Sequence, residues 1–469
     1  MAAASCEAPA TTLTAGLAFN ITAATARHPW ASSSLDALAA AREPVVLTGS
    51  PLVATWPALT EWSDLCSRCP RLGRVFRSPS NVFYHENPRK PLSELVSLSR
   101  EGVNLTCAAF LHSLGDSTQH LYMSAPLDDD DVDNDLSDLL ADVPGISQLH
   151  IGEAAPRPLT TNLWAGKGTV AEAHFDASHN LFVQVRGVKR FVLARPAIAH
   201  RLRLFPEPHP RDRHTQLRID ASGRLEAGAD HLDHLPEGGP LPAQEAVLTP
   251  GDVLYVPPFT VHRVGTVDAD GEAAAGEVSL SINVFSESFE NKAAGAMAAA
   301  GLPPSVQQNA GVPPQNRVKL LASWLRHVIY AVLHGEGDDG EGGGEAASVE
   351  QTAAAFLAPQ LEWRWGLLHE QIGCGGWKAE SCPRDGGLPA PLLNEARAHA
   401  ARVVAPLREA AVARALRPGV RELLLISYVE LVSRTFVGHT RVCSFLRCLA
   451  LETSWAPEEA YPGVRVHVK

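Results

Sequence analysis

Two candidate ligands of a metal site stand two residues apart in this sequence, at His174 and Asp176. Side chains alternate between the faces of a β-strand, so these two point the same way if the segment is extended. His262, which closely follows the run Gly-Asp-Val-Leu-Tyr-Val-Pro-Pro at 251–258, is the best candidate for a third ligand. Two imidazoles and one carboxylate on one side of a metal ion leave the opposite coordination positions open. The sequence therefore predicts a metal centre at which chemistry takes place.

The His-x-Asp motif alone carries little weight, because the chain holds a second copy at 231–233 with His234 directly behind it. That copy lies in a stretch rich in Pro and Gly without a strand pattern, so we interpret it as a solvated loop. The first copy is followed by two β-rich runs, 180–185 and 188–194, joined by an Arg-Gly pair. Such runs around a short turn predict a hairpin, which would return Lys189 towards the metal ligands.

Strand patterns fill the part of the chain that holds these ligands. Short runs bounded by Pro or Gly predict strands at 43–49, 119–124, 161–170, 253–256, 261–267 and 278–285. The last run alternates almost ideally, with apolar residues on one face and Ser279, Ser281, Asn283 and Phe285 on the other. Periodicity alone leaves open whether this second face meets water or lines a ligand cavity inside a barrel. Residues 92–115 are predicted to form a helix of mixed quality.

Near residue 290 the pattern changes, and apolar residues then recur at helical spacing. This pattern covers 318–333 and roughly 350–370, 393–416 and 420–450, with an acidic Gly-rich linker at 335–345. A long insertion without periodicity, 200–245, separates the two halves of the candidate metal site, and loops of this length are functional or mobile. The predicted organisation is a leader (1–40), a mostly β domain (41–290) and a helical region (291–469).

Charge and hydropathy argue against two classes of function. The 469 residues include 52 acidic and 40 basic side chains, a formal net charge of −12, whereas general nucleic-acid binders need clustered Lys and Arg. No window of about 18 uncharged apolar residues is present, so no transmembrane helix is predicted. The N-terminus faintly resembles an organelle transit peptide, but arginine is scarce and a loose leader is the simpler interpretation. We expect a cytoplasmic or nuclear protein, with organelle import left open.

Eight cysteines in so long a chain do not make a disulfide framework, so reduced thiols in a reducing compartment are expected. Cys66 and Cys69 could be half of a zinc site, with Cys374 and Cys382 as the other half. The second pair is spaced too widely for the usual zinc knuckle, which argues against such a site.

Several motifs, taken in order, point to a known family. They are Asn162-Leu-Trp-Ala-Gly, His174-Phe-Asp176 with Asn180, Gln184-Val-Arg-Gly-Val-Lys189, Gly251-Asp-Val-Leu-Tyr-Val-Pro and Ser281-Ile-Asn283-Val-Phe. In this combination, residues 40–290 resemble the JmjC and cupin-like family of Fe(II)- and 2-oxoglutarate-dependent oxygenases. The resemblance is closest to the protein-hydroxylase branch, which includes the asparaginyl hydroxylase that acts on hypoxia-inducible factor.

The resemblance implies a double-stranded β-helix, or jelly roll, with flanking helices, in which His174, Asp176 and His262 hold Fe(II). It implies that Lys189 pairs with the distal carboxylate of 2-oxoglutarate, assisted by Tyr122. A dicarboxylate inside a barrel needs a buried cation, and its 2-oxo acid end occupies two of the open metal positions. The remaining position is then left for dioxygen.

The resemblance also places Asn180 and Asn283 near the cosubstrate or the metal. One departure is Ala171, three residues before the first ligand. The hypoxia-factor enzyme has a threonine there that helps to bind 2-oxoglutarate. Thr169 is close in this sequence, but it would sit at a different point along the strand.

The function expected from these features is hydroxylation of a side chain in a protein or peptide substrate. The alternative within the same chemistry is demethylation of N-methyl-lysine, against which the chain offers no zinc module of a histone reader. Hydroxylation of RNA is disfavoured by the acidic charge. A metal-free cupin acting as a binding or scaffold protein is a different class; the triad with Lys189 opposes it, and Ala171 keeps it open. By analogy, the C-terminal helices are expected to form a homodimer.

Overall fold

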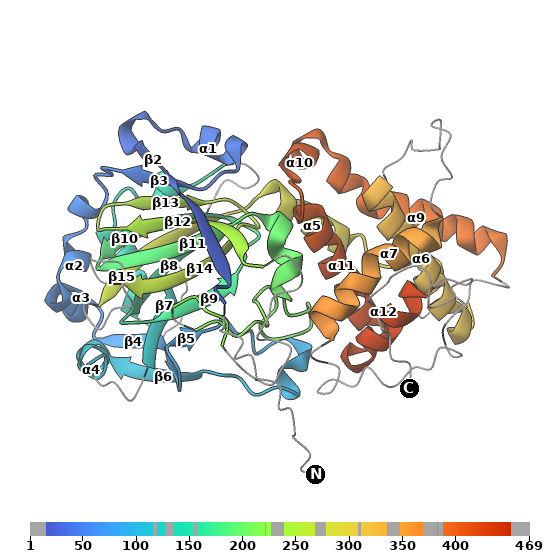
Figure 1. The fold of residues 1–469 in the computed structure, drawn as a ribbon, viewed down its shortest axis with the longest axis horizontal. Coiled ribbons are helices and arrows are strands. Elements are labelled where there is room, and N and C mark those ends of the chain that lie inside the picture. Colours follow the sequence, from blue (N-terminus) through green and yellow to red (C-terminus); the bar gives the residue numbers. More distant parts are fainter. Residues whose placement is uncertain are drawn as a thin grey trace, which may run out of the picture.

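The computed structural model describes residues 16–115, 120–127, 135–152, 158–220, 222–226, 239–267, 278–307, 311–334, 348–366 and 388–451, with Leu368 and Cys382. Within these ranges a β domain is followed by a region of helices, and the two lie side by side (Figure 1). No described helix is both long and apolar enough to cross a lipid bilayer. The second His-x-Asp motif at 231–233 and the linker at 335–345 lie outside the described residues.

Two sheets form the β domain. The larger has the strand order β2 (Ala26–Pro29), β3 (Val45–Thr48), β13 (Val253–Val256), β10 (His179–Arg186), β15 (Ser279–Ser286), β8 (Pro158–Gly166), β7 (His120–Pro126), β4 (Arg71–Ser78) and β6 (Glu101–Thr106). The smaller has the order β1 (Phe19–Ala24), β12 (Leu241–Leu248), β11 (Val188–Ala194), β14 (Val261–Val267), β9 (Val170–His174) and β5 (Val82–Phe83). Most neighbouring strands are antiparallel, and the predicted mostly β, jelly-roll fold is confirmed.

Consecutive strands change sheet at the corner between β10 and β11. β10 pairs with β13 and β15, whereas β11 pairs with β12 and β14. The predicted hairpin is therefore wrong, because the two strands lie in opposite sheets. Gly187 forms the corner with φ at 65°, and a Cβ at this position would lie 3.0 Å from the Cα of Ser279. The corner carries Lys189 into the interior from the smaller sheet.

Alternation along the strands decides which side chains lie between the sheets. The apolar faces of β10 and β15 point away from the space between the sheets and belong to one hydrophobic core. The residues of these faces are Leu181, Val183, Val185, Leu280, Ile282 and Val284. On the inner faces, the rings of Phe182 on β10 and Phe191 on β11 meet with centroids 4.9 Å apart. Ser279, Ser281 and Asn283 are at most 1% exposed. The polar face of β15 therefore lines the barrel interior and does not meet water.

Short helices from the N-terminal third flank the outer face of the larger sheet (Figure 1). They are α1 (Leu35–Ala41), α2 (Pro57–Thr60), α3 (Trp62–Arg68) and α4 (Cys107–Ser113). Trp56, Leu65 and Phe110 from this part of the chain are buried in the same core as the apolar face of β10. Trp56 is thus a core residue of the β domain.

The C-terminal region consists of α5 (Phe289–Ala299), α6 (Pro314–His334), α7 (Val349–Gln360), a π-helical turn (Leu361–Trp365), α9 (Ala390–Arg408), α10 (Ala410–Ala415), α11 (Val420–Val437) and α12 (Val442–Ala450). Burial at Trp324, Leu325, Val328 and Ile329 gives α6 a continuous apolar stripe. The helical stretch predicted at 420–450 is divided by Gly438, whose φ is 84°.

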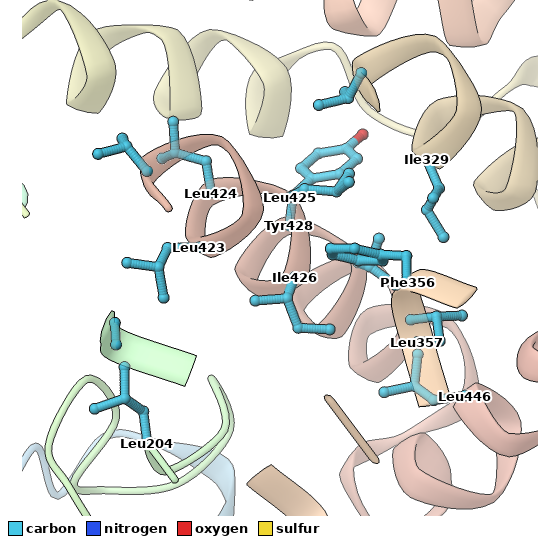
Figure 2. Close-up of a cluster of buried hydrophobic side chains, with 14 of the residues drawn as sticks. Leu204, Ile329, Phe356, Leu357, Leu423, Leu424, Leu425, Ile426, Tyr428 and Leu446 are labelled. Carbon is cyan, nitrogen blue, oxygen red and sulfur yellow. The ribbon is translucent and has the colours of Figure 1, made fainter. Parts of the chain in front are cut away.

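The helices pack against the β domain through the insertion after β11. Leu204 from this insertion belongs to the same hydrophobic core as Leu423, Ile426 and Phe356. Figure 2 shows Leu204 on the green segment below Leu423 of α11. The first part of the insertion is therefore an ordered bridge between the two regions and not a free loop.

Two local predictions from the sequence are wrong. Residues 19–29, placed in a loose leader, form β1 and β2, which pair with β12 and β3. Of the helix predicted at 92–115, residues 107–113 do form α4, but residues 101–106 form the strand β6, which pairs with β4. In both cases hydrogen bonds to strands distant in sequence outweigh the local pattern.

The cysteines also depart from the expectation of reduced thiols. Disulfides join Cys66 to Cys107 and Cys382 to Cys448. Cys66 and Cys382 are therefore not available as ligands, which removes the zinc site considered from the spacing.

Candidate metal centre

Paired strands place the two candidate histidine ligands opposite each other. His174 at the end of β9 pairs with His262 on β14, and Ala171 pairs with Val264. The three residues from Ala171 to His174 on β9 thus lie opposite only two residues on β14, from Val264 to His262. This bulge places the side chains of Ala171 and His174 on the same face of the sheet. Ligand atoms of His174, Asp176 and His262 all lie within 4.8 Å of one another. The structure therefore brings the three predicted ligands together.

Asp176 reaches the site from a turn, since β9 ends at His174. Strand alternation was therefore the wrong reason for its orientation. The backbone carbonyl of Asp176 accepts a hydrogen bond of 2.7 Å from the N–H of Phe259. Phe259 adopts φ 61° and stacks on Phe175 with ring centroids 5.2 Å apart. This turn holds the Asp176 carboxylate 3.5 Å from Nε2 of His262.

Hydrogen bonds fix both imidazoles in the form that binds a metal through Nε2. Nδ1 of His174 donates to the carbonyl of Glu172 at 2.6 Å, and Nδ1 of His262 donates to the carbonyl of Thr260 at 3.0 Å. A carbonyl only accepts, so in each neutral ring the proton is on Nδ1 and the lone pair is on Nε2. Such outer contacts set the tautomer and orientation of metal-binding histidines.

The protonation states of the cluster also suit a cation. Burial, followed by the neighbouring His262, lowers the pKa of His174 to about 3, so its ring is neutral at physiological pH. Burial opposes ionisation of Asp176, but His174 and His262 hold the pKa of its carboxyl below the usual value. Two imidazoles that present Nε2, that of His174 being neutral, and a carboxylate on one side of a partly accessible cluster fit Fe(II) with open positions.

Lys189 lies deeper in the barrel and is 2% exposed. Its Nζ lies 5.0 Å from the ring centroid of Phe182 and 5.9 Å from that of Tyr122. No ion pair joins it to an acidic side chain of the described residues. Burial lowers the pKa of Lys189 to about 7. A buried cation without a counter-ion is costly, so the site fits an anionic ligand.

Thr266 is a site residue that the sequence reasoning missed. It pairs directly with Lys189 across β14 and β11, so both side chains lie on the inner face. Its hydroxyl is 3.4 Å from that of Thr169, and both residues are buried. A hydroxyl of the kind that is absent at Ala171 is therefore present beside Lys189 at Thr266, which only the register of β14 against β11 could identify.

Asn180 and Asn283 form one network on the inner face of the larger sheet. Oδ1 of Asn283 accepts from Nε1 of Trp164 at 2.7 Å and from Nδ2 of Asn162 at 3.2 Å. Nδ2 of Asn283 donates to Oδ1 of Asn180 at 3.0 Å. Asn283 is thus held by protein groups and orients Asn180, whose Nδ2 remains able to donate to a ligand.

Tyr122 stands on β7 between two aromatic rings. Its ring lies 5.9 Å from that of Trp164 and 5.4 Å from that of Phe83. Burial raises the pKa of its phenol, so the hydroxyl stays protonated and able to donate. Tyr122 therefore lies near Lys189, beside which it was predicted to assist in binding the distal carboxylate of 2-oxoglutarate.

The long insertion contributes a second residue that the sequence did not single out. The ring of His214 stacks on that of His174 with centroids 4.7 Å apart and an angle of 14°. The backbone of the insertion also pairs with β9 at this point, because the N–H of Thr215 donates to the carbonyl of Ala173 at 2.9 Å. His214 is not a ligand as placed, because its Nε2 accepts from the N–H of His85 at 3.2 Å.

Comparison with known proteins agrees with this architecture. A family model described as a cupin-like domain matches residues 31–292. Jumonji C domain-containing protein 5 of Drosophila melanogaster is 38% identical over 117 residues, which are 24% of this chain and 26% of that protein. The tRNA wybutosine-synthesizing protein 4 of Aspergillus oryzae is 30% identical over 112 residues, 24% of this chain and 9% of that protein. Its counterpart in Aspergillus fumigatus is 31% identical over 120 residues, 26% of this chain and 10% of that protein.

These relatives are matched over about a quarter or less of their own length. The family match is broader, since 31–292 is 262 of the 469 residues and contains all the candidate site residues. The chain therefore belongs to the family of proteins with a cupin-like domain.

Proposed function

We propose that this protein is an Fe(II)- and 2-oxoglutarate-dependent oxygenase that hydroxylates a side chain of a protein substrate. The observation that carries the proposal is the pairing of two sites in one barrel. His174, Asp176 and His262 offer a metal three ligands on one side, and Lys189 offers a buried cation with no counter-ion among the described residues. A dicarboxylate that chelates a metal through its 2-oxo acid end needs both.

Each residue then has a defined task. The three ligands would hold Fe(II), which with 2-oxoglutarate and dioxygen would supply oxidative hydroxylation coupled to formation of succinate and carbon dioxide. Lys189 neutralises the distal carboxylate, and the Thr266 hydroxyl lies where it can donate to the same group. The apolar walls at Phe182 and Phe191 keep water from this end of the barrel.

The substrate class rests on charge and on the relatives. The Drosophila relative is named for a Jumonji C domain, and the Aspergillus relatives are named for synthesis of a tRNA base. The formal net charge of −12 disfavours a polyanionic substrate, so we infer a protein or peptide. This assignment to the protein-hydroxylase branch follows from the family likeness and the charge together.

The test is an anaerobic titration of the purified protein with Fe(II) and 2-oxoglutarate, followed by the visible charge-transfer absorbance. We expect a band for the wild type and none for His174→Ala. A His399→Ala variant, which removes a buried histidine beside Trp324 in the helical region, should keep the band. Absence of the band in folded wild-type protein would support a metal-free binding protein instead. Release of formaldehyde from N-methyl-lysine peptides would indicate a demethylase.

A further inference from the structure

A cavity with a volume of about 560 Å³ is lined by none of the residues assigned above to the metal or the cosubstrate. Its apolar lining includes Phe205 and Leu368, which with Leu92 form a small cluster separate from the larger cores. Leu95 and Leu98 also line it and are 49% and 40% exposed. They are two of the four large apolar side chains that are exposed in the described part of the chain. Exposed apolar surface gathered at a cavity marks a binding site.

A chain of contacts links one wall of the cavity to the candidate metal centre. Glu86 lines the cavity, and the preceding residue, His85, donates its N–H to Nε2 of His214 at 3.2 Å. The His214 ring in turn stacks on the ligand His174. The cavity wall is therefore connected to a candidate metal ligand through the His85 backbone and the His214 ring.

The charged groups in the lining already have partners. Nε of Arg211 donates to Glu86 at 2.7 Å, and its guanidinium lies 4.4 Å from the ring centroid of Tyr84. Glu86 also accepts from the backbone N–H and the hydroxyl of Ser99 at 3.0 Å. Because both charges are neutralised within the protein, the cavity does not call for a charged ligand.

Two polar atoms of the lining keep unused hydrogen-bonding capacity. Nδ1 of His209 accepts from the N–H of Arg211 at 3.0 Å, so in the neutral ring Nε2 carries the proton and can donate. Nε2 of Gln216 donates to the carbonyls of Leu204 and Arg364, so its Oε1 can accept.

Both His209 and Gln216 are at least nine-tenths buried and line the cavity. In the described part of the chain, no hydrogen bond occupies His209 Nε2 or Gln216 Oε1. One free donor and one free acceptor on an apolar lining match the carbonyl and N–H of peptide groups.

We propose that this cavity is a subsite for the polypeptide substrate, which places peptide groups against His209 and Gln216 and an apolar side chain between Leu95 and Leu98. The inference rests on the proposed function for the identity of the bound chain as substrate. The proposed subsite would determine substrate specificity. An apolar substrate residue bound in the cavity would fix which neighbouring residue of the substrate reaches the metal centre.

Binding can be tested on metal-free protein with N-acetyl-leucine N-methylamide as the probe, by saturation-transfer difference NMR at millimolar concentration. We expect signals on the leucine methyls with wild type, and binding about tenfold weaker for the double variant Leu95→Ser/Leu98→Ser. N-acetyl-alanine N-methylamide should bind more weakly than the leucine probe. His209→Phe keeps an aromatic ring against Phe205 and should weaken binding of both probes.

The matched control is Leu17→Ser/Ile21→Ser, which removes the other two exposed large apolar side chains, located at β1. This control should bind the probe as wild type does. Equal binding by wild type and Leu95→Ser/Leu98→Ser, or no binding by wild type, would overturn the subsite. A wild-type dimer in light scattering that Leu95→Ser/Leu98→Ser makes monomeric would assign the cavity to a second copy instead. The probe is bound to metal-free protein, so a failure of probe binding does not affect the charge-transfer test of the proposed function. Likewise, absence of the charge-transfer band does not affect the probe-binding test.

Discussion

The imidazole of His214 lies almost parallel to that of His174, with 4.7 Å between ring centroids. In the sequence, the two residues are separated by β10, β11 and the first part of the insertion. The ring of His214 is held at both nitrogens, by the carbonyl of Asp212 at 3.2 Å and the N–H of His85 at 3.2 Å. A ring fixed in this way restricts the plane of the metal ligand that it touches. His214 is therefore a positioning residue of the candidate metal centre.

Replacing His214 by Ala should weaken metal binding by roughly tenfold or more, which is the usual cost of losing a group that orients a ligand. The measurement is a titration with Co(II), followed by its visible absorption, at unchanged thermal stability. His399→Ala serves as the matched control and should bind Co(II) as wild type does. Unaltered affinity in folded His214→Ala would show that the stack has no positioning role.

Binding of 2-oxoglutarate should weaken as pH rises through about 7. Burial holds the pKa of Lys189 near this value in the empty protein, and only the protonated amine attracts a dicarboxylate. Above about pH 7 the affinity should therefore fall by up to about tenfold per pH unit, with one proton taken up on binding. Calorimetry in two buffers of different ionisation enthalpy measures this proton. Lys189→Arg, which stays charged, should bind without this pH dependence.

Thr266→Val should raise the KM for 2-oxoglutarate by about fivefold, because one hydrogen bond is worth about 1 kcal/mol. The side chain keeps its shape, so the affinity for Fe(II) should not change. Thr266→Ser retains the hydroxyl and should behave like wild type. If Thr266→Val and wild type gave the same KM, Thr266 would have no role in cosubstrate binding.

Glu430 joins the helical region to the insertion and is fully buried. Its carboxylate accepts from Arg364 at 2.8 and 3.0 Å, from Nε1 of Trp365 at 2.9 Å and from the N–H of Glu207 at 2.8 Å. Glu430→Ala leaves the Arg364 charge buried without a partner and should lower the free energy of unfolding by about 3–5 kcal/mol.

Urea denaturation measures this change in stability. Glu101→Ala removes an exposed carboxylate 3.8 Å from Arg77 and should change the free energy by less than about 1 kcal/mol. Comparable stability of the Glu430→Ala and Glu101→Ala variants would mean that the buried network contributes little.

The sequence was sufficient to predict the candidate ligands and the local character of the strands that carry them. His174, Asp176, His262 and Lys189 could be selected by type and by their neighbouring motifs. The alternation from 278 to 285 predicted β15 closely, because a period of two residues is a local property of an extended chain. The helix after residue 314 was also visible, since its apolar stripe lies within one segment.

Which faces are buried, and which residues distant in sequence are in contact, could be known only from the folded chain. Burial of Ser281 and Asn283 depends on closure of the two sheets, and Thr266 joins Lys189 only through the register of β14 against β11. His214 reaches His174 through backbone pairing between strands and an insertion that has no pattern of its own. Such contacts are fixed by packing between segments far apart in the chain. A local sequence pattern does not indicate which distant segment it will pair with.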